Sequence, residues 1–240
     1  FVLPKIKLVK SIENKTKLDG KFSFESDNLV KNYQTNIHEK ININDLVFKS
    51  NPKISKNGFY NNYEFILKNA NTDTQNSGTY KNNQSYYFGG LLQYNSSLPL
   101  IKETENHQNV LRPKLALKIS PEHTKDNSQS FTRIDINNIY GINRLSSDDS
   151  FEGGVSLTIG NEYSITDIKT LRENFSFKIA NNLRFKDNDD LPQNNQMGSK
   201  NSNLFGEISF NPNSYFKTKY NFSRKNNFSD TKDESLGAEF

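Results

Sequence analysis

Apolar and polar residues alternate with a period of two along several long stretches of this sequence. The clearest run covers residues 151–165, and the run over residues 171–185 repeats it. In the first run, one face carries Phe151, Val155, Leu157, Ile159, Tyr163 and Ile165, and the other carries Glu152, Ser156, Thr158, Glu162 and Ser164. This period is that of a β-strand with one apolar and one polar face. Weaker runs lie over residues 33–47, 59–68, 111–119 and 216–222, and we expect about eleven or twelve strands in all.

The alternating runs are long, and their connections are of two kinds. Several runs exceed ten residues, whereas strands of soluble sheets usually have about five or six. Residues 211–214 form a short polar connection, while residues 69–83 and 186–201 form long ones. This combination is typical of a transmembrane β-barrel. The sequence therefore predicts an all-β fold, an antiparallel transmembrane β-barrel of which this chain holds a part. A soluble antiparallel sandwich produces the same alternation and is the alternative fold.

The composition fits a barrel with a wet interior. Only 32% of the residues are hydrophobic, against roughly 45–50% in an average domain. The 12% of aromatic residues nevertheless argues against disorder. In such a barrel half of each strand faces water, so a small apolar share is enough to cover the lipid-facing half. The chain begins with Phe1 and its only methionine is Met197, so we expect a fragment or a processed product.

No residue pattern points to catalysis. The chain has no cysteine, which excludes disulfides, thiolate zinc sites and cysteine nucleophiles. The pairs at 89–90 and 153–154 are glycines within strand patterns and match no phosphate-binding loop. Asp187, Asp189 and Asp190 lack the spacing of a calcium motif, and we expect them in a solvated loop. The net charge of +4 is spread without a basic stripe. We therefore expect no enzyme activity, no cofactor, no metal ion and no nucleic-acid partner.

One stretch is more specific than the rest. Residues 133–154 read RIDINNIYGINRLSSDDSFEGG, and this stretch resembles a motif in the barrel of the LptD (organic solvent tolerance) family of lipopolysaccharide-assembly proteins. The matching places are filled by Asn143, Arg144, Asp149, Phe151, Glu152 and Gly153. Ser147 stands where the family prefers glycine, and Ser150 stands where it prefers arginine. Residues 2–6, 111–121 and 183–212 resemble other parts of the same barrel less specifically.

The resemblance carries several expectations. It implies a large barrel in the bacterial outer membrane, with an N-terminal periplasmic jellyroll and a lipoprotein partner, LptE. It also implies a function without covalent chemistry, in which lipopolysaccharide arrives over periplasmic bridge proteins and is inserted into the outer leaflet. We expect residues 1–240 to be a single region of that barrel, without the jellyroll and without the strands of the lateral opening. Two alternatives remain: a smaller complete porin-type barrel that ends at Phe240, and a secreted soluble β-sheet adhesin.

The motif residues also suggest a role by themselves. Asn143 and Arg144 begin a polar connection between two alternating runs, and residues 148–150 supply turn residues. We expect Arg144 to pair with Asp149 or Glu152 at the inner wall or rim of the barrel and thereby to fix the strand register. The alternative role is direct contact with a passing lipopolysaccharide molecule.

Overall fold

The described residues form a single antiparallel sheet. A computed structural model describes residues 5–32, 36–122, 125–129, 132–145, 147–225 and 230–239. Tyr33 and Phe240, which the sequence analysis placed in a strand and at a possible C-terminus, lie outside these ranges. The strands are β1 (Ile6–Ile12), β2 (Gly20–Asn32), β3 (His38–Ser50), β4 (Lys53–Ile54), β5 (Tyr60–Gln75), β6 (Asn83–Ser97), β7 (Leu100–Glu103), β8 (His107–Ser120), β9 (Gly154–Asp167), β10 (Glu173–Arg184), β11 (Asn201–Asn213), β12 (Phe216–Arg224) and β13 (Thr231–Glu239). Among the described residues, no helix is long and apolar enough to span a membrane.

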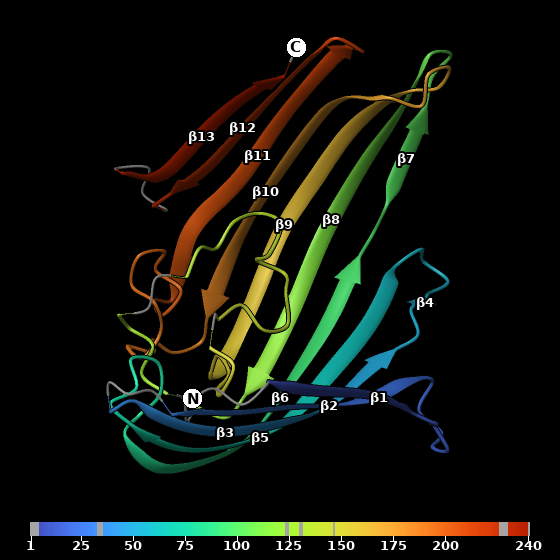
Figure 1. The fold of residues 1–240 in the computed structure, drawn as a ribbon. Coiled ribbons are helices and arrows are strands. Elements are labelled where there is room, and N and C mark those ends of the chain that lie inside the picture. The colour runs from blue at the N-terminus through green and yellow to red at the C-terminus, as the bar shows by residue number, and fades with distance from the viewer. Residues whose placement is uncertain are drawn as a thin grey trace.

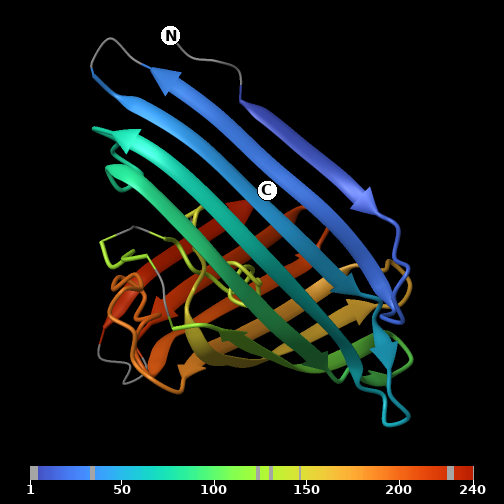
Figure 2. The same cartoon turned by 90° about the horizontal axis from the view of Figure 1, so that it is seen from below.

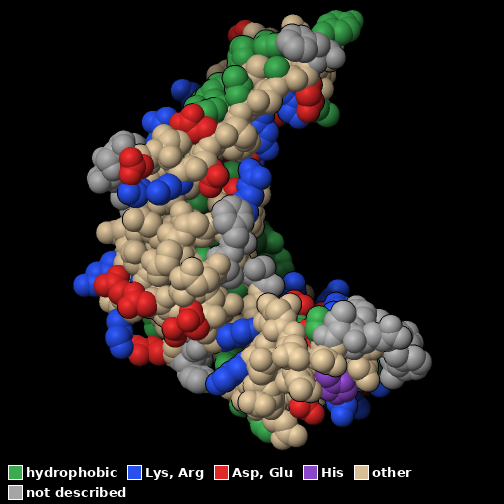
Figure 3. All heavy atoms as spheres, turned by 60° about the vertical axis from the view of Figure 1, so that its left-hand side comes forward, with side chains coloured by type: hydrophobic (Ala, Val, Ile, Leu, Met, Phe, Trp, Pro, Cys, Tyr) green, Lys and Arg blue, Asp and Glu red, His purple; other side chains and the backbone are tan. Residues whose placement is uncertain are grey.

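The strands follow one another across the sheet nearly in chain order. Eleven of them form the continuous path β1-β2-β3-β5-β6-β8-β9-β10-β11-β12-β13, while the short β4 and β7 pair beside it with β5 and β8. The prediction of an all-β antiparallel fold is confirmed, and the about eleven or twelve strands expected compare with eleven on this path and the two short strands beside it. The sheet is strongly curved but not closed into a barrel, with β1 and β13 at its two edges (Figures 1 and 2). The space-filling view shows the same open arc (Figure 3).

The two ends of the sheet carry different connections. At one end the strands are joined by short segments such as residues 168–172 and 214–215, and at the other by segments that include residues 121–153 and 185–200. The latter two loops fold back into the hollow of the sheet (Figures 1 and 2). We call the side that holds them the concave face and the opposite side the convex face.

Over β8 to β10, polar side chains predominate on the concave face of the sheet and apolar side chains on the convex face. On β9, Thr158 of the concave face is 3% exposed, whereas its neighbour Ile159 of the convex face is 40% exposed. Asn182 on β10 is fully buried, and Ile119 on β8 is 44% exposed. A soluble sheet would bury its apolar face instead. This distribution matches the expectation that the apolar half of each strand faces lipid.

Two details of the predicted strands are wrong. Phe151 was placed on the same face as Val155, but β9 begins only at Gly154. Gly154 has a φ of +85°, a conformation that favours glycine, and the chain turns there. Phe151 is therefore buried against the concave face, beside Val47 and Leu91. Leu171 likewise lies in a turn before β10, with a φ of 55° and 80% exposure.

Two neighbouring strands of the sheet, β6 and β8, pair over only a short part of their length. β5 and β6 pair from Tyr60 to Thr74, but β6 pairs with β8 only from Leu92 to Ser97. The loop over residues 121–153 covers the place where β6 runs on beyond β8. Its Phe151 packs against β3, β5 and β6, and its Ile134, Ile136 and Ile139 pack against Ala180 and Phe205 on β10 and β11. This loop thus contacts both halves of the concave face.

Candidate functional site: a buried ion cluster on the concave face

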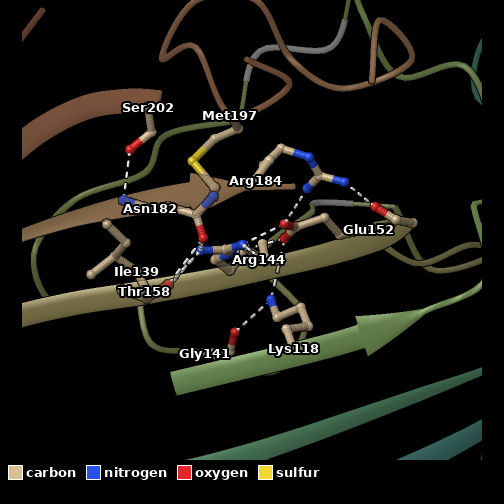
Figure 4. A network of polar contacts seen from close by, with 12 residues as sticks. Lys118, Ile139, Gly141, Arg144, Glu152, Thr158, Asn182, Arg184, Met197 and Ser202 are labelled. Atoms are coloured by element: carbon tan, nitrogen blue, oxygen red, sulfur yellow. Dashed lines mark hydrogen bonds and ion pairs between the residues drawn. The ribbon is translucent and has the colours of Figure 1, made fainter. Parts of the chain in front are cut away.

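The motif residues Arg144 and Glu152 meet in the hollow of the sheet, over the ends of β8, β9 and β10 (Figure 4). The Arg144 Nε donates a hydrogen bond to Oε2 of Glu152 at 2.8 Å, and its Nη2 pairs with the other carboxylate oxygen. Two parallel bonds between a guanidinium and a carboxylate fix their relative orientation as well as their distance. Both side chains are buried. The expected pairing of Arg144 with Glu152 is confirmed.

Two further cations approach the same carboxylate. The Lys118 Nζ, from β8, lies 3.2 Å from Oε2 of Glu152, and the Arg184 Nη1, from β10, lies 3.0 Å from Oε1. Arg184 also donates to the carbonyl oxygen of Gly153. Glu152 therefore connects the loop to two strands that are not neighbours in the sheet.

The cluster contains more positive than negative charge. Three basic side chains surround one carboxylate, and oxygen acceptors without a formal charge take further hydrogen bonds from Arg144 and Lys118. The Arg144 Nη1 donates to the carbonyl oxygen of Ile139 at 3.0 Å and to Oδ1 of Asn182 at 3.0 Å. The Lys118 Nζ donates to the carbonyl oxygen of Gly141 at 3.1 Å. These bonds matter because a buried charge without partners is strongly destabilising.

The cations also keep Glu152 ionised. Burial by itself would raise the pKa of this carboxyl, but the positive charges of Arg144, Lys118 and Arg184 outweigh it and hold the pKa well below its usual range. The carboxylate is therefore charged at every physiological pH. It acts as a fixed anion rather than as a group that exchanges protons.

The other motif residues have separate surroundings. Asp149 does not pair with Arg144, as the alternative expectation had it; it pairs with Lys125 at 3.0 Å. Phe151 is fully buried, and the Lys68 Nζ lies 5.2 Å from the centre of its ring. The side chain of Asn143 is exposed to solvent. The structure thus brings Arg144, Glu152 and Gly153 together and leaves Asn143 outside the cluster.

No pattern in the sequence connects Lys118, Arg184 and Asn182 to the motif. All three lie on the polar face of their strands, at the end nearest the long loops, and this position was the available signal. The residue that each one contacts depends on how the loop over residues 121–153 folds. Alternation within a strand contains no information on that path.

A glycine allows the loop to lie close to β9. A Cβ placed on Gly160 would lie about 2.3 Å from the Tyr140 hydroxyl and about 2.2 Å from the Ile179 carbonyl oxygen. No side chain fits at such distances. Tyr140 in turn has the Lys114 Nζ 4.4 Å from its ring centre, an arrangement that is attractive for a cation over an aromatic face.

A row of alternating charges crosses the concave face nearer to the short connections. Glu162 on β9 lies 2.8 Å from the Lys114 Nζ on β8. Glu207 on β11 lies 2.9 Å from the Lys178 Nζ on β10 and 2.6 Å from the Lys219 Nζ on β12. Opposite charges on neighbouring strands stabilise one pairing register over its slipped alternatives.

These groups form no arrangement for chemistry. Within the described ranges no group of three or more histidine, aspartate or glutamate side chains could hold a metal ion. Asp187, from the acidic triplet, accepts a hydrogen bond from the Lys200 backbone N–H at 2.7 Å and so orders its own loop. The cluster around Glu152 is closed by its own partners and can fix the loops to the wall.

The comparisons with known proteins agree with this architecture. No curated protein matches the chain. The family model described as LptD, LPS transport system D, matches residues 63–238, a range that runs from within β5 into β13 and includes the whole ion cluster. The chain therefore belongs to the LptD family, outer-membrane β-barrel proteins that transport and assemble lipopolysaccharide and are not enzymes.

Proposed function

We propose that this chain is a single region of the LptD barrel wall, whose concave face lines the lumen and whose convex face meets lipid. One observation supports this above all: over β8 to β10 the concave face carries buried polar side chains such as Lys118, Thr158 and Asn182, while the convex face exposes the apolar Leu111, Ile119 and Ile159. The role of such a wall is to insert lipopolysaccharide into the outer leaflet, with the saccharide passing through a polar lumen.

The connections support an orientation. Bacterial outer-membrane barrels have short turns on the periplasmic side and longer loops on the extracellular side. The loops over residues 121–153 and 185–200 lie at the same end of the sheet, which we assign to the cell exterior. They also touch each other, since the Asn127 backbone N–H donates to the Asp190 carbonyl oxygen at 2.7 Å and the Asn195 Nδ2 donates to the Thr132 carbonyl oxygen at 2.9 Å. Together they narrow the outward end of the lumen.

Within this wall, the motif holds the loops in place. Arg144 and Glu152 are buried among protein groups, so a passing lipopolysaccharide molecule does not reach them. Asn143 is the exposed member of the motif and is the one placed for contact with the cargo. Register and loop order are therefore the roles of Arg144, Asp149, Phe151, Glu152 and Gly153.

The partners follow from the family resemblance. A lipoprotein of the LptE type would sit in the lumen, where the charged row of Glu162, Lys178 and Glu207 offers polar contacts. Periplasmic bridge proteins would deliver lipopolysaccharide through the jellyroll domain of the family.

Depletion and complementation test this function. Cells depleted of the protein should lose newly made lipopolysaccharide from their surface, measured by labelling intact cells, and a copy of the wild type should restore it. The Arg144→Ala variant should restore it poorly and admit large antibiotics that the outer membrane normally excludes. Lys186→Ala is the matched control, because its pair with Glu122 is exposed on both sides. Unchanged surface lipopolysaccharide after depletion would refute the proposed function.

A further inference from the structure

The convex face changes from apolar to polar within one step along three strands. Phe22, Phe48 and Phe65 stack across β2, β3 and β5, with ring centres 4.6 Å and 5.3 Å apart. The next convex row, Phe24, Leu46 and Leu67, is also apolar. Beyond it, toward the long-loop end, the convex positions become Ser26, Asn28, Asn42, Asn44, Asn69 and Asn71. We call these six residues the amide patch.

The residues of the amide patch are polar members of alternating runs, as the sequence pattern had placed them. Here, however, the polar side chains face outward, whereas the outward side chains of a transmembrane barrel are apolar. On β3, Ile41 and Ile43 face the hollow and are buried there with Ala70, while Asn42 and Asn44 face outward. The expectation that the apolar residues of this run face lipid is wrong here. Near the loops, other parts of the protein cover the concave side chains, so these can be apolar. The outward side chains then do not need to be apolar.

Four members of the patch form a closed ring of hydrogen bonds. The Ser26 hydroxyl donates to Asn44 at 2.8 Å, Asn44 to Asn42 at 2.7 Å, Asn42 to Asn28 at 2.5 Å, and Asn28 back to Ser26 at 3.1 Å. Asn71 joins the ring by donating to Asn42 at 3.2 Å. The ring holds the amides in a fixed orientation.

The ring uses only part of the hydrogen-bonding capacity of the patch. A primary amide has two N–H donors and two lone pairs, and each ring asparagine donates one N–H to the ring. Such unused groups would be costly against hydrocarbon. The patch must therefore lie above the hydrocarbon, against headgroups or water, and the row Phe24, Leu46 and Leu67 marks the upper edge of the apolar belt.

Aromatic and cationic groups adjoin the patch. On β6 the convex row continues as Tyr86 and Phe88, which are each 75% exposed, as in the aromatic girdle at a membrane interface. A groove of about 330 Å³ beside them is lined by Asn28, Asn42, Asn71, Lys40 and Tyr86, among others. One row further toward the loops, Lys40 lies directly opposite Asp73 of β5, and both residues line the groove.

We propose that the amide patch, with Lys40 and Tyr86, binds the saccharide headgroup of glycolipid molecules resident in the outer leaflet. Oriented amides match sugar hydroxyls, Tyr86 offers a flat face, and Lys40 with Asp73 adds a charged donor and a charged acceptor for further sugar hydroxyls. The occupant is a membrane lipid that surrounds the barrel, distinct from the cargo in the lumen, and its binding fixes the depth of the wall in the membrane. This inference rests on the proposed orientation, in which the long loops face outward.

Photocrosslinking in the outer membrane tests the inference. The whole protein, with benzoylphenylalanine in place of Tyr86, should form adducts with lipopolysaccharide in living cells. The Asn42→Ala/Asn71→Ala double variant should reduce the adduct yield at least threefold at equal levels of folded protein. Asn71→Thr removes one amide of the patch but keeps the four bonds among Ser26, Asn28, Asn42 and Asn44, and it should also reduce the adduct yield if the double variant folds poorly. Asn109→Ala, on the convex face near the short-connection end, is the matched control and should leave the yield unchanged.

Each other outcome overturns the inference. Adducts with phospholipid only, no adduct, or an adduct yield that both patch variants leave unchanged would show that the patch does not select glycolipid headgroups. The Lys81→Cys variant, in an exposed loop of the long-loop end, separates this failure from a wrong orientation. Labelling of that cysteine on intact cells by an impermeant maleimide supports the orientation, and absence of labelling refutes both proposals.

Discussion

Arg144 holds Glu152 by both carboxylate oxygens, from a position eight residues earlier in the same loop. The pair closes the loop on itself, and Lys118 and Arg184 tie the closed loop to β8 and β10. We expect the Arg144→Ala variant to lose about 1–3 kcal/mol of stability, because buried acceptors on Glu152, Asn182 and Ile139 lose their donor while Lys118 and Arg184 still neutralise the carboxylate. Urea unfolding in detergent, followed on gels by heat-modifiable migration, measures this. Lys186→Ala, which breaks an exposed pair, should cost less than about 1 kcal/mol. Equal losses in the two variants would refute the structural role of Arg144.

The stability of the loop should depend on pH through Glu152. The folded state holds the pKa of this carboxyl below its usual range, so its contribution is fully present above the unfolded value of about 4.3. That contribution should be lost as the pH falls below this value toward the folded pKa. Glu152→Gln should be less stable at neutral pH. Its free energy of unfolding should also fall less than that of the wild type when the pH is lowered from 7 to 3. If the free energy of unfolding of the variant depended on pH as strongly as that of the wild type, Glu152 would not be the group responsible.

Gly160 should not tolerate a side chain. An added Cβ would meet the Tyr140 hydroxyl and the backbone of β10 at the same time, so we expect Gly160→Ala to cost about 1–3 kcal/mol by overpacking. Tyr140→Phe should relieve only part of this cost, because the Ile179 carbonyl oxygen remains. Gly78→Ala is the control, since an added Cβ at that position meets nothing within 4 Å. If the two glycine variants were equally stable, the close approach of Tyr140 to β9 would be wrong.

An added charge should impair membrane insertion on one face of β9 and not on the other. Ile159→Arg places a cation on the convex face and should reduce insertion into lipid vesicles. The free energy of the inserted state should rise by about 2–4 kcal/mol if the residue lies at the depth of the membrane midplane. Ser164→Arg puts the same side chain on the concave face of the same strand, and we expect insertion close to that of the wild type. The fraction that migrates as folded protein on unheated gels is the measurement. A larger loss for Ser164→Arg would show that the faces are assigned the wrong way round.

Glu207 should couple Lys178 to Lys219 across three strands. Both lysines approach its carboxylate, so replacing either one should weaken the register less than replacing Glu207. A double-mutant cycle of Lys178→Ala with Glu207→Ala should give a coupling energy of about 0.5–3 kcal/mol. A coupling energy of zero would mean that the charge row does not act on the strand register.

The period of two was sufficient to predict the sheet and most of its faces. Thr158 and Ile159 lie on the sides that alternation assigned to them, because side chains on a strand must alternate. Phe151 could not be placed this way, since the positive φ of Gly154 ends the strand before it is reached. Ile41 and Ile43 could not either, because their burial depends on what covers the hollow. The family motif identified Arg144 and Glu152, but Lys118 and Arg184 join them only through tertiary folding.

The short pairing between β6 and β8 has a consequence for the membrane. Where β6 continues past β8, no strand within the described part of the chain hydrogen-bonds to it on that side, and Phe151 with its neighbours fills the place instead. Shortening this loop should therefore uncover the unpaired edge of β6 and open the wall at the long-loop end. Cells that carry such a deletion would leak even if every strand were correctly paired.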